Sequence, residues 1–443
     1  MNLDRAVTHL QEAIRIKTIS AKTDEEMDHK VYESFLGFLE ESFPLVHEKL
    51  ERTLVNHYAP LYYWKGKRSN GRVLFLCHYD VVPAEEEGWE EGPFSGAISD
   101  GKIYGRGTSD DKNSVIGLLE TFENLLEKDF VPEVDLYLAM GFDEENHGLR
   151  GAAKLAEHLE KEGLTFDLIL DEGGIVTEGS MMGIDQKIAV IGVAEKGNTV
   201  MEFTFTGDEG HSSAPPKSTS IGKMAAFIKD VEDHPFKARL VEPVKSMLET
   251  IAPYKSGVEK IALSKPKAFF PIIKGVLEKN KETAAMLRST ISFTMATSGT
   301  APNVLPKKAS VTANIRVLPG DSIQDIKRYF KSFGHEMEIN YHSLNEATRV
   351  SNRNTEAYQY LEKSIKSVFG DVVTTPYLMI GGTDARHYDR LSENIYRFMP
   401  CVLTQQELGL MHAAGEYLSI ENLERMLVFY DGFIRNLEEL YGI

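Results

Sequence analysis

Residues 73–80 read Val-Leu-Phe-Leu-Cys-His-Tyr-Asp, an apolar run that ends in a histidine and an aspartate, and this stretch decides the fold class. An apolar run of this length, bounded by polar residues, is typical of a strand buried on both faces of a parallel sheet. Similar runs follow at 136–140, 168–170 and 188–193. The sequence therefore predicts a mostly parallel central sheet.

Helical patterns separate these runs. Apolar residues recur at helical spacing from Val115 to Leu126 and again from Leu149 to Leu159. Strands that alternate with amphipathic helices are the pattern of α/β proteins, in which the helices cover the sheet. We therefore predict an α/β body.

The pattern changes near residue 200. Met201, Phe203 and Phe205 alternate with polar residues, as in a strand with one face in water, and a second such strand is expected at 311–317. A chain of 443 residues is also long enough for two domains. We interpret residues 195–318 as one inserted domain.

The α/β pattern resumes after this insertion. Helices are predicted at 323–333 and 355–368, and strands near 377–380 and 395–399. The body is therefore predicted to comprise residues 1–194 and 319–443.

Composition excludes several classes of protein. The net charge of -18 opposes a nucleic-acid partner, and no apolar run approaches the roughly 18 residues of a membrane span. Cys77 and Cys401 lack a Cys-x-x-Cys spacing and favour buried free thiols in a reducing compartment. The first 16 residues have helical spacing rather than the apolar block of a signal peptide. We expect a cytoplasmic protein that has neither a nucleic acid nor a membrane as its partner.

Short acidic or histidine-bearing motifs follow the predicted strands, where open α/β sheets place ligands. His78 and Asp80 share one face of extended chain, so Asp80 is placed to orient His78. Taken alone, this motif favours a histidine that is simply satisfied by hydrogen bonds at a strand end. Asp110 and Asp111 precede a helix, and one of them is sufficient for an N-cap. Metal ligation and capping are both open for this pair.

Three successive acids, Asp143, Glu144 and Glu145, follow the strand at 136–140. They repel one another unless water or cations absorb their charge. A solvated loop tolerates such a run. A metal-activated water, however, needs one carboxylate on the metal and a second as base, which this run provides.

Asp171, Glu172 and His412 carry little weight singly. With the other motifs they supply two histidines and three carboxylates, enough for two metal ions if one carboxylate bridges. Two divalent cations and three carboxylates leave one positive charge, so the site stays electrophilic.

These motifs together resemble those of the zinc-dependent metallopeptidase family of aminoacylase, carboxypeptidase S, acetylornithine deacetylase, succinyl-diaminopimelate desuccinylase, peptidase V and carnosinase. The resemblance extends from the first predicted helix to the last, and the motifs occur in the same order as in the family. The motifs are most similar to those of carboxypeptidase S. The stretches that carry it are Gly105-Arg-Gly-Thr-Ser-Asp-Asp-Lys112, Leu170-Asp-Glu-Gly-Gly174, Gly210-His-Ser-Ser-Ala-Pro-Pro216 and Gly381-Gly-Thr-Asp-Ala-Arg386.

The resemblance implies a role for each motif residue. Asp110 would bridge two metal ions, zinc above all, with cobalt and manganese as alternatives. Glu144 would be the general base, and Asp80 would orient a ligand histidine. The implied metal ligands are His78, Asp110, Glu145, Glu172 and His412, with Asp111, Asp171 and Asp143 as neighbouring alternatives in register.

The resemblance also implies a ferredoxin-like lid at 195–318 that is often used for dimerisation. His211 would reach the active site of the partner in a homodimer and polarise the scissile carbonyl, although a loop histidine beside prolines is the simpler interpretation. Four further residues match positions near the substrate carboxylate: Asn303 and Arg316 in the lid, and Gly382 and Thr383 in a glycine-rich carboxylate-binding loop.

The predicted activity is hydrolysis of an amide bond next to a free carboxylate, in a small peptide or an N-acyl amino acid. A dipeptidase or aminopeptidase, and a deacylase of a biosynthetic intermediate, are the alternatives within the enzymes. A catalytically silent, metal-stabilised binding protein is the alternative outside them, although such a protein has no need of a spare base beside Glu145.

Overall fold

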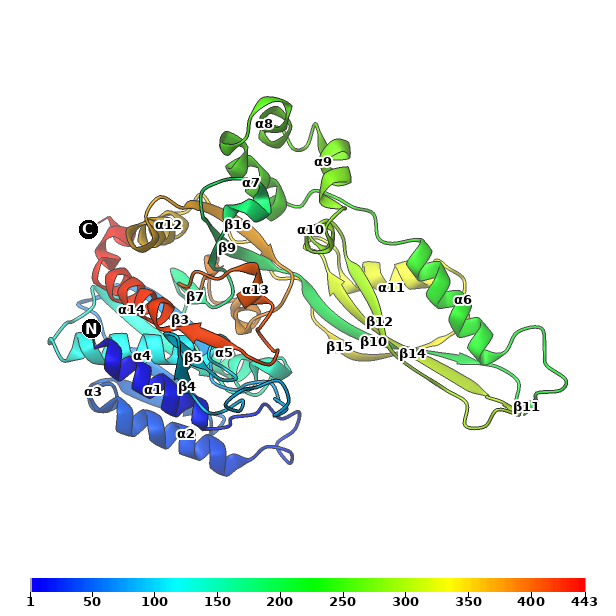
Figure 1. Ribbon diagram of the computed structural model, residues 1–443, viewed down its shortest axis with the longest axis horizontal. Helices are drawn as coiled ribbons and strands as arrows, with labels where there is room; N and C mark the ends of the chain where they lie inside the picture. The colour runs from blue at the N-terminus through cyan, green and yellow to red at the C-terminus, as the bar shows by residue number, and fades with distance from the viewer. Residues whose placement is uncertain (1, 443) are drawn as a thin grey trace. The chain divides into compact units, whose positions relative to one another are not determined.

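The computed structural model describes residues 2–442, which form two compact units. The first unit, the body, comprises Met1–Val193, Ser351–Tyr377 and Thr383–Ile443. The second unit comprises Ala194–Val350 and the short segment Leu378–Gly382. Figure 1 labels the elements of both units.

A nine-stranded sheet forms the centre of the body, and its four middle strands run parallel in the order β6-β3-β7-β17. Antiparallel pairs extend the sheet on both sides of them. The predicted α/β class with parallel central strands is confirmed. The strands are β1 (Glu51–Val55), β2 (Ala59–Trp64), β3 (Arg68–His78), β6 (Val134–Gly141), β7 (Leu168–Asp171), β8 (Val176–Thr177), β9 (Ile188–Glu195), β16 (Val373–Met379) and β17 (Ile395–Arg397).

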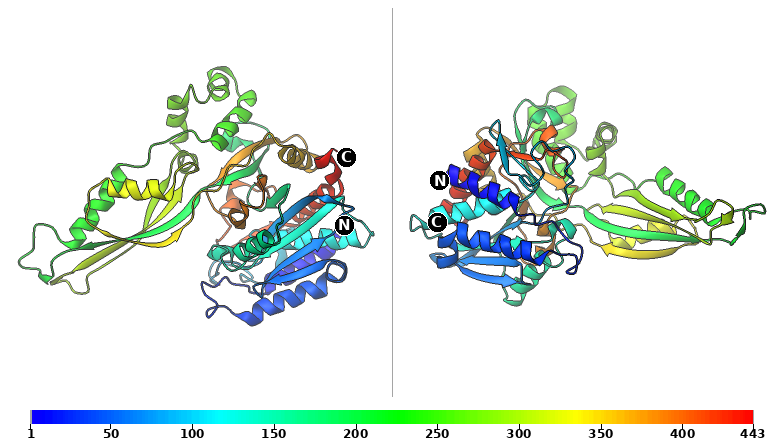
Figure 2. Two further views of the ribbon diagram at one scale, coloured as in Figure 1. Left: turned by 180° about the vertical axis from the view of Figure 1, so that it is seen from behind. Right: turned by 60° about the horizontal axis from the view of Figure 1, so that its bottom comes forward.

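Helices pack on this sheet (Figures 1 and 2). Helix α4 contacts β3 and α14, and α5 contacts β6. Between residues 2 and 442, no helix is both long and apolar enough to cross a membrane. The helices of the body are α1 (Leu3–Arg15), α2 (His29–Ser42), α3 (Pro44–Lys49), α4 (Lys112–Leu126), α5 (Ala152–Lys161), α12 (Glu356–Phe369), α13 (Gln405–Leu408) and α14 (Ile420–Arg435).

A small three-stranded sheet and short 3-10 turns complete the body. The sheet pairs strands that lie far apart in the sequence, in the order β18-β5-β4. The elements are β4 (Ala97–Ser99), β5 (Lys102–Tyr104), β18 (Tyr417–Ser419), η1 (Glu144–Asn146), η2 (Gly179–Met182), η4 (Asp384–Tyr388) and η5 (Leu437–Tyr441).

The second unit is built on a four-stranded antiparallel sheet in the order β12-β14-β10-β15. Its main elements follow the chain order β10-α6-β12-β14-α11-β15, with a helical insertion between α6 and β12. They are β10 (Gly197–Thr206), β11 (Gly210–His211), α6 (Ser220–Asp233), α7 (Glu242–Ile251), η3 (Ala252–Tyr254), α8 (Gly257–Ser264), α9 (Phe270–Leu277), α10 (Lys281–Ala285), β12 (Thr290–Ser298), β13 (Val304–Leu305), β14 (Lys308–Val317), α11 (Ile323–Lys331) and β15 (Glu338–Leu344).

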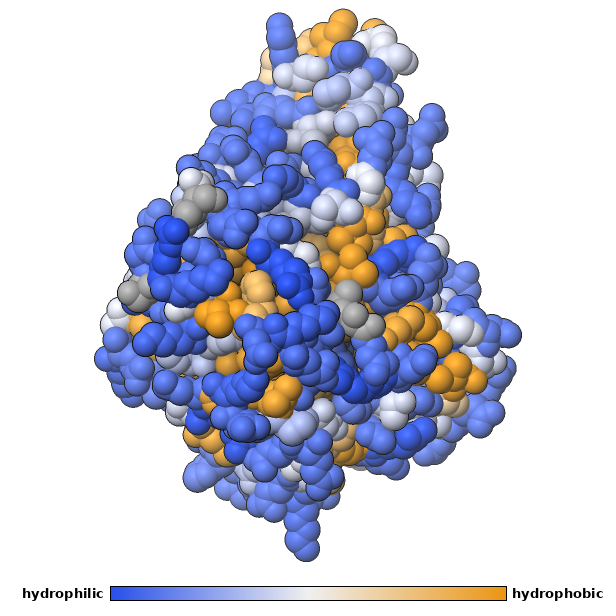
Figure 3. Space-filling view, turned by 90° about the vertical axis from the view of Figure 1, so that its left-hand side faces the viewer, coloured by the Kyte–Doolittle hydropathy of each residue, from blue (hydrophilic) through white to orange (hydrophobic). Residues whose placement is uncertain are grey.

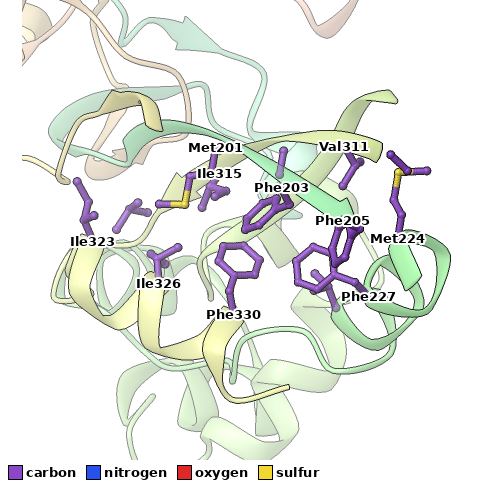
Figure 4. Close-up of a cluster of buried hydrophobic side chains, with 14 residues drawn as sticks. Met201, Phe203, Phe205, Met224, Phe227, Val311, Ile315, Ile323, Ile326 and Phe330 are labelled. Carbon is purple, nitrogen blue, oxygen red and sulfur yellow. The ribbon is translucent and has the colours of Figure 1, made fainter. Parts of the chain in front are cut away.

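Helices α6 and α11 cover one face of this sheet with an apolar core (Figures 2 and 4). The alternation of Phe203 and its neighbours along β10 turns their side chains toward the helices. Phe203 meets Phe227 of α6 at 4.9 Å between ring centroids and Phe330 of α11 at 4.6 Å. Aromatic pairs at this distance add to the stability that burial alone provides.

The predicted boundary at residue 318 is wrong, because the second unit continues to Val350. Ile326 and Phe330 of α11 are buried in the core of this unit, and β15 pairs with β10. An amphipathic helix shows which of its faces is covered but not which sheet covers it, so the sequence pattern could not assign α11 to its unit.

Candidate metal centre

The acidic motifs of the body lie at the carboxyl ends of three neighbouring parallel strands. His78 is the last residue of β3, Glu144 begins the turn after β6, and Asp171 ends β7. Because β6, β3 and β7 are adjacent in the sheet, their carboxyl ends bring these motifs to one edge.

Asp110 lies between two histidines. Its Oδ1 is 3.0 Å from His78 Nε2, and its Oδ2 is 3.0 Å from His412 Nε2. The side chain of His78 is buried, whereas half of the His412 side chain is exposed. One carboxylate thus contacts both histidines through different oxygens, which is the arrangement that a bridging ligand requires.

Two groups of potential metal ligands share Asp110. One contains His78 and Glu172, the other contains Glu145 and His412, and within each group the ligand atoms lie within 4.8 Å of one another. Glu172 Oε1 is 3.4 Å from His78 Nε2, and Glu145 Oε1 is 3.3 Å from His412 Nε2. The groups contain the five residues that the family resemblance implied as ligands.

The neighbouring acids have other partners. Asp111 accepts a hydrogen bond from the backbone N–H of His78, and its side chain makes no capping bond to α4. Asp171 accepts from the N–H groups of Glu172 and Ala385. These hydrogen bonds hold the loop before α4 and the loop after β7 in place.

Asp143 shares this bracing role. Its carboxylate accepts hydrogen bonds from the N–H groups of Arg150 and Gly151, at 2.8 and 2.7 Å. The bonds close the loop that follows β6, so Asp143 points into its own loop rather than toward the two ligand groups.

Asp80 holds both histidine and base in place. Its Oδ1 is 3.2 Å from His78 Nδ1, on the side of the ring away from Asp110. The same carboxylate accepts hydrogen bonds from the N–H groups of Glu144 and Glu145, both at 3.1 Å. Such a contact fixes the orientation of a ligand histidine and increases its basicity.

Glu144 has a cationic neighbour that the sequence analysis did not identify. Arg386 Nη2 lies 3.2 Å from Glu144 Oε1, and both side chains are largely buried. Arg386 belongs to the Gly381–Arg386 motif, of which only Gly382 and Thr383 were predicted as site residues. The arginine that ends this motif is the sequence feature from which its role in the site could have been predicted.

A second missed residue braces the loop before Asp110. Glu416 Oε1 accepts hydrogen bonds from the N–H groups of Gly107 and Ser109, both at 3.0 Å, and its Oε2 forms a buried ion pair with Arg106. A single glutamate four residues after His412 gives no recognisable motif. Its role follows only from the folded structure.

The charges of the site are unbalanced without cations. Burial raises the pKa of Glu172 to about 8 and also raises the pKa of Glu145. Hydrogen bonds with Asp110 and Glu145 raise the pKa of His412 to about 10. Burial opposes protonation of His78, but its contacts with Asp110, Asp80 and Glu172 nevertheless raise its pKa well above the usual range. The protons take the place of missing positive charge.

The donor set fits two divalent ions. Two imidazole nitrogens and three carboxylates are ligands that zinc accepts, and cobalt and manganese accept them as well. Metal binding requires neutral histidines and ionised carboxylates, so bound cations would reverse the protonation described above. The residues present therefore fit a dinuclear centre with Asp110 as the shared ligand.

The predicted residues of the second unit fall into two places. His211 on β11 pairs with β13, next to Asn303, whose carbonyl accepts a hydrogen bond from Ser212 N–H. Both side chains are exposed, and His211 Nδ1 contacts Ser213 Oγ at 2.8 Å. Arg316 lies near the other end of the sheet, on β14, where its Nε donates to Asn314 Oδ1 at 3.2 Å. The structure does not bring Arg316 next to Asn303.

Gly382 and Thr383 connect β16 to η4. Gly382 is partly exposed, whereas Thr383 is buried and its hydroxyl accepts a hydrogen bond from Ala385 N–H. The loop therefore leads directly to Arg386 and to the contact that this arginine makes with Glu144.

Known proteins are similar to this chain in sequence. Residues 74–436 match the family described as peptidase family M20/M25/M40. The N-fatty-acyl-amino acid synthase/hydrolase PM20D1 of Xenopus tropicalis is 34% identical over 437 residues, covering 97% of this chain and 85% of the relative. Probable carboxypeptidase S-like 2 of Dictyostelium discoideum is 35% identical over 439 residues, with 97% and 84% coverage.

Solved structures agree in fold. The M20 family metallo-carboxypeptidase Sso-CP2 from Sulfolobus solfataricus superimposes with a TM-score of 0.72 at 20% identity, covering 98% of this chain and 99% of that protein. The YXEP protein of Bacillus subtilis, described as a dinuclear metal-binding peptidase, has a TM-score of 0.59 at 13% identity, covering 97% and 98%. The match of the family over most of the chain confirms the predicted resemblance, and the chain belongs to peptidase family M20/M25/M40 and is a hydrolase of that family.

Proposed function

We propose that this hydrolase cleaves the amide bond of N-acyl amino acids and small peptides next to a free carboxylate. The observation that carries the proposal is a pair of ligand groups that share Asp110, with Glu144 directly beside the ligand Glu145. Binding alone has no need of the second glutamate, whereas hydrolysis needs a base next to the metal-bearing carboxylate.

The relatives support this substrate class. One is named an N-fatty-acyl-amino acid synthase/hydrolase, and another a probable carboxypeptidase S-like protein. An N-acyl amino acid and the C-terminal residue of a peptide both carry a free carboxylate next to an amide bond. We infer that N-acyl amino acids are preferred over dipeptides with a free amino group.

We propose two zinc ions, one held by His78, Asp110 and Glu172 and the other by Asp110, Glu145 and His412. When bound, such ions polarise the substrate carbonyl and make water acidic enough to be deprotonated near neutral pH. Asp80 keeps His78 in one orientation and fixes the backbone of Glu144 and Glu145. Asp80 thereby fixes the position of the general base Glu144 relative to the ligands His78 and Glu145.

Glu144 is the proposed general base. It accepts a proton from the attacking water while the new carbon–oxygen bond forms at the amide carbon, and it returns this proton to the nitrogen as the carbon–nitrogen bond breaks. The products are a carboxylic acid and an amino acid with a free amino group. Arg386, 3.2 Å from Glu144 Oε1, holds the carboxylate in place.

We propose that the second unit acts as a lid and as a dimerisation domain. Its order of strands and helices, β-α-β-β-α-β, is that of ferredoxin-like domains. Lys308, on β14, pairs with Thr206, the last residue of β10 before the chain continues to β11. Arg316 lies eight residues further along β14, and eight residues of strand correspond to roughly 26 Å. One small substrate cannot span the distance from Arg316 to His211 of the same chain.

We therefore assign these residues to different sites of a homodimer. Arg316, together with the Gly382–Thr383 loop, would bind the carboxylate of a substrate in its own subunit through charge-assisted hydrogen bonds. His211 and Asn303 would donate to the carbonyl oxygen of a substrate bound by the other subunit, where negative charge develops in the transition state.

The compartment is proposed from the cysteines. Cys77 and Cys401 are both free and buried, and neither is paired in a disulfide. Buried free thiols suit the reducing conditions of the cytoplasm, which we propose as the location of the enzyme.

Hydrolysis of a matched panel tests the proposal. The panel contains N-acetyl and N-fatty-acyl amino acids, free dipeptides and carboxyl-amidated forms of each, assayed with metal-loaded and chelated enzyme. We expect cleavage of the N-acyl amino acids only when metal and a free carboxylate are present. Preference for free dipeptides would favour a dipeptidase, and absence of any cleavage by metal-loaded enzyme would favour a binding protein.

A further inference from the structure

The helical insertion of the second unit, residues 234–289, exposes an unusual number of apolar side chains. Five of the sixteen large apolar side chains that are exposed among the described residues lie between Tyr254 and Val276, a segment of 23 residues. The five are Tyr254, Val258, Ile261, Ile272 and Val276. Scattered single apolar residues need no explanation on a protein surface, but a group of them does.

The exposed apolar residues form one stripe on each of two short helices. In α8, Val258 and Ile261 are three residues apart and 76% and 56% exposed. In α9, Ile272 and Val276 are four residues apart and 63% and 60% exposed. Residues at these spacings share a helix face. Each helix therefore turns an apolar face to the solvent.

Both helices also have a separate buried face. Ala262 of α8 and Ile273 of α9 are at most 8% exposed and hold the helices on the unit. The outward stripes are consequently not needed to attach the helices to the rest of the insertion, and the fold itself does not explain them.

The same segment is strongly basic in an acidic chain. Residues 255–281 contain seven lysines and two glutamates, a net charge of +5, whereas the whole chain carries -18. Five of these lysines are exposed: Lys260, Lys265, Lys267, Lys279 and Lys281. Figure 3 shows hydrophobic residues among hydrophilic ones at the upper end of the view, the end at which α8 lies in Figure 1.

We propose that this surface, α8 and α9 with their flanking lysines, docks the enzyme onto an anionic lipid membrane. Helices that lie in a membrane interface combine an outward apolar face with lysines, which contact the acidic headgroups. With eight residues each, α8 and α9 are far too short to span a bilayer of about 20 helical residues, so the attachment is peripheral.

A second copy of the chain is a weaker occupant. In a two-fold symmetric contact each patch meets its own copy, and the two sets of lysines would repel each other. Acidic lipid headgroups, in contrast, complement the positive charge, and acyl chains accept Ile261 and Ile272. The proposal concerns binding and holds whichever substrate the active site cleaves.

Vesicle flotation of the full chain tests the proposal. Vesicles of phosphatidylcholine alone are compared with vesicles in which about a third of the lipid is phosphatidylglycerol, at low salt and at about 0.5 M salt. We expect the protein to float with the anionic vesicles at low salt, to release at high salt and to ignore the neutral vesicles. Absence of binding to anionic vesicles would overturn the proposal.

Two variants assign the binding to the surface. One replaces the stripes through Val258→Ser, Ile261→Ser, Ile272→Ser and Val276→Ser, and the other reverses charge through Lys260→Glu, Lys265→Glu and Lys279→Glu. Each lysine near an acidic membrane contributes about fivefold to binding, so we expect at least a tenfold loss in either variant. Every replaced side chain is exposed or an outward stripe residue, so the melting temperature should stay unchanged.

Matched controls change the same residue types elsewhere. Leu54→Ser with Ile98→Ser removes apolar side chains that are 43% and 46% exposed, and Lys128→Glu with Lys161→Glu reverses exposed lysines of the body. We expect these variants to bind like the unchanged protein. Equal losses in controls and test variants, or a dimer that dissociates when the stripes are replaced, would overturn the membrane assignment.

Discussion

The metal centre of the body and the β11 tip of the second unit differ in how firmly their functional side chains are held. Asp80 is buried, contacts His78 and accepts two backbone hydrogen bonds. The side chain of His211 is exposed, and it contacts Ser213 in its own loop. A preorganised site holds its catalytic groups in place by itself, whereas an exposed side chain on a two-residue strand needs a further surface to act on.

The largest effect is expected from the Glu144→Gln variant. The substitution removes the base but none of the five proposed ligands, so turnover should fall by about 10³-fold or more while metal content is unchanged. Steady-state kinetics and metal analysis of the same sample measure both. Glu157→Gln, an exposed site on α5, is the matched control. Near-normal turnover in Glu144→Gln would exclude the proposed base.

The His211→Ala variant tests whether this exposed side chain acts on the active site of the other subunit. If His211 stabilises the oxyanion of a substrate on the other subunit, kcat should fall by about 10²- to 10³-fold with unchanged metal content. Mixing His211→Ala with Glu144→Gln should then restore activity, because a mixed dimer contains one site with both residues intact. Failure of the mixture to recover activity, under conditions where subunits exchange, would contradict a shared site.

Asp80→Asn should have an intermediate effect. It keeps the shape of the side chain but weakens its contact with His78, and loss of such a supporting carboxylate typically lowers metal affinity or activity by about 10- to 100-fold. Metal titration and kcat measure this. The control Asp167→Asn changes an acid of the body away from the ligand groups. Equal effects of the two substitutions would show that Asp80 has no special role.

The smallest loss is expected from Arg316→Ala. Removing a charge-assisted hydrogen bond to the substrate carboxylate should lower kcat/KM by roughly tenfold on free acids and leave amidated substrates unaffected. Arg316→Lys should recover part of the loss, and Arg328→Ala in the same unit should show none. An unchanged kcat/KM on free acids would refute the carboxylate contact.

Much of the body could be predicted because local signals agreed with one another. The runs at 136–140 and 168–170 lie within β6 and β7, and acidic residues begin within three positions of the end of each run. Buried parallel strands leave an apolar run that is easy to recognise, and their carboxyl ends meet at one edge. Strand pattern and motif position therefore pointed to the same place.

Other features leave no such signal. Glu416 is one glutamate among many, and its contacts to Gly107 and Ser109 join positions more than 300 residues apart. The extension of the second unit to Val350 depends on which sheet α11 covers, and periodicity does not carry that information. The predicted roles of His211 and Arg316 depend on how two subunits are arranged, and local sequence patterns carry no information about that arrangement.

The most direct test of the account is a titration of chelated enzyme with zinc, in which bound metal and turnover are followed together. We predict two ions per chain, activity that reaches its maximum at the second, loss of both sites in Asp110→Ala, and loss of one in Glu172→Gln. Saturation with a single ion, or two ions bound in Asp110→Ala, would contradict a dinuclear centre built on a shared carboxylate.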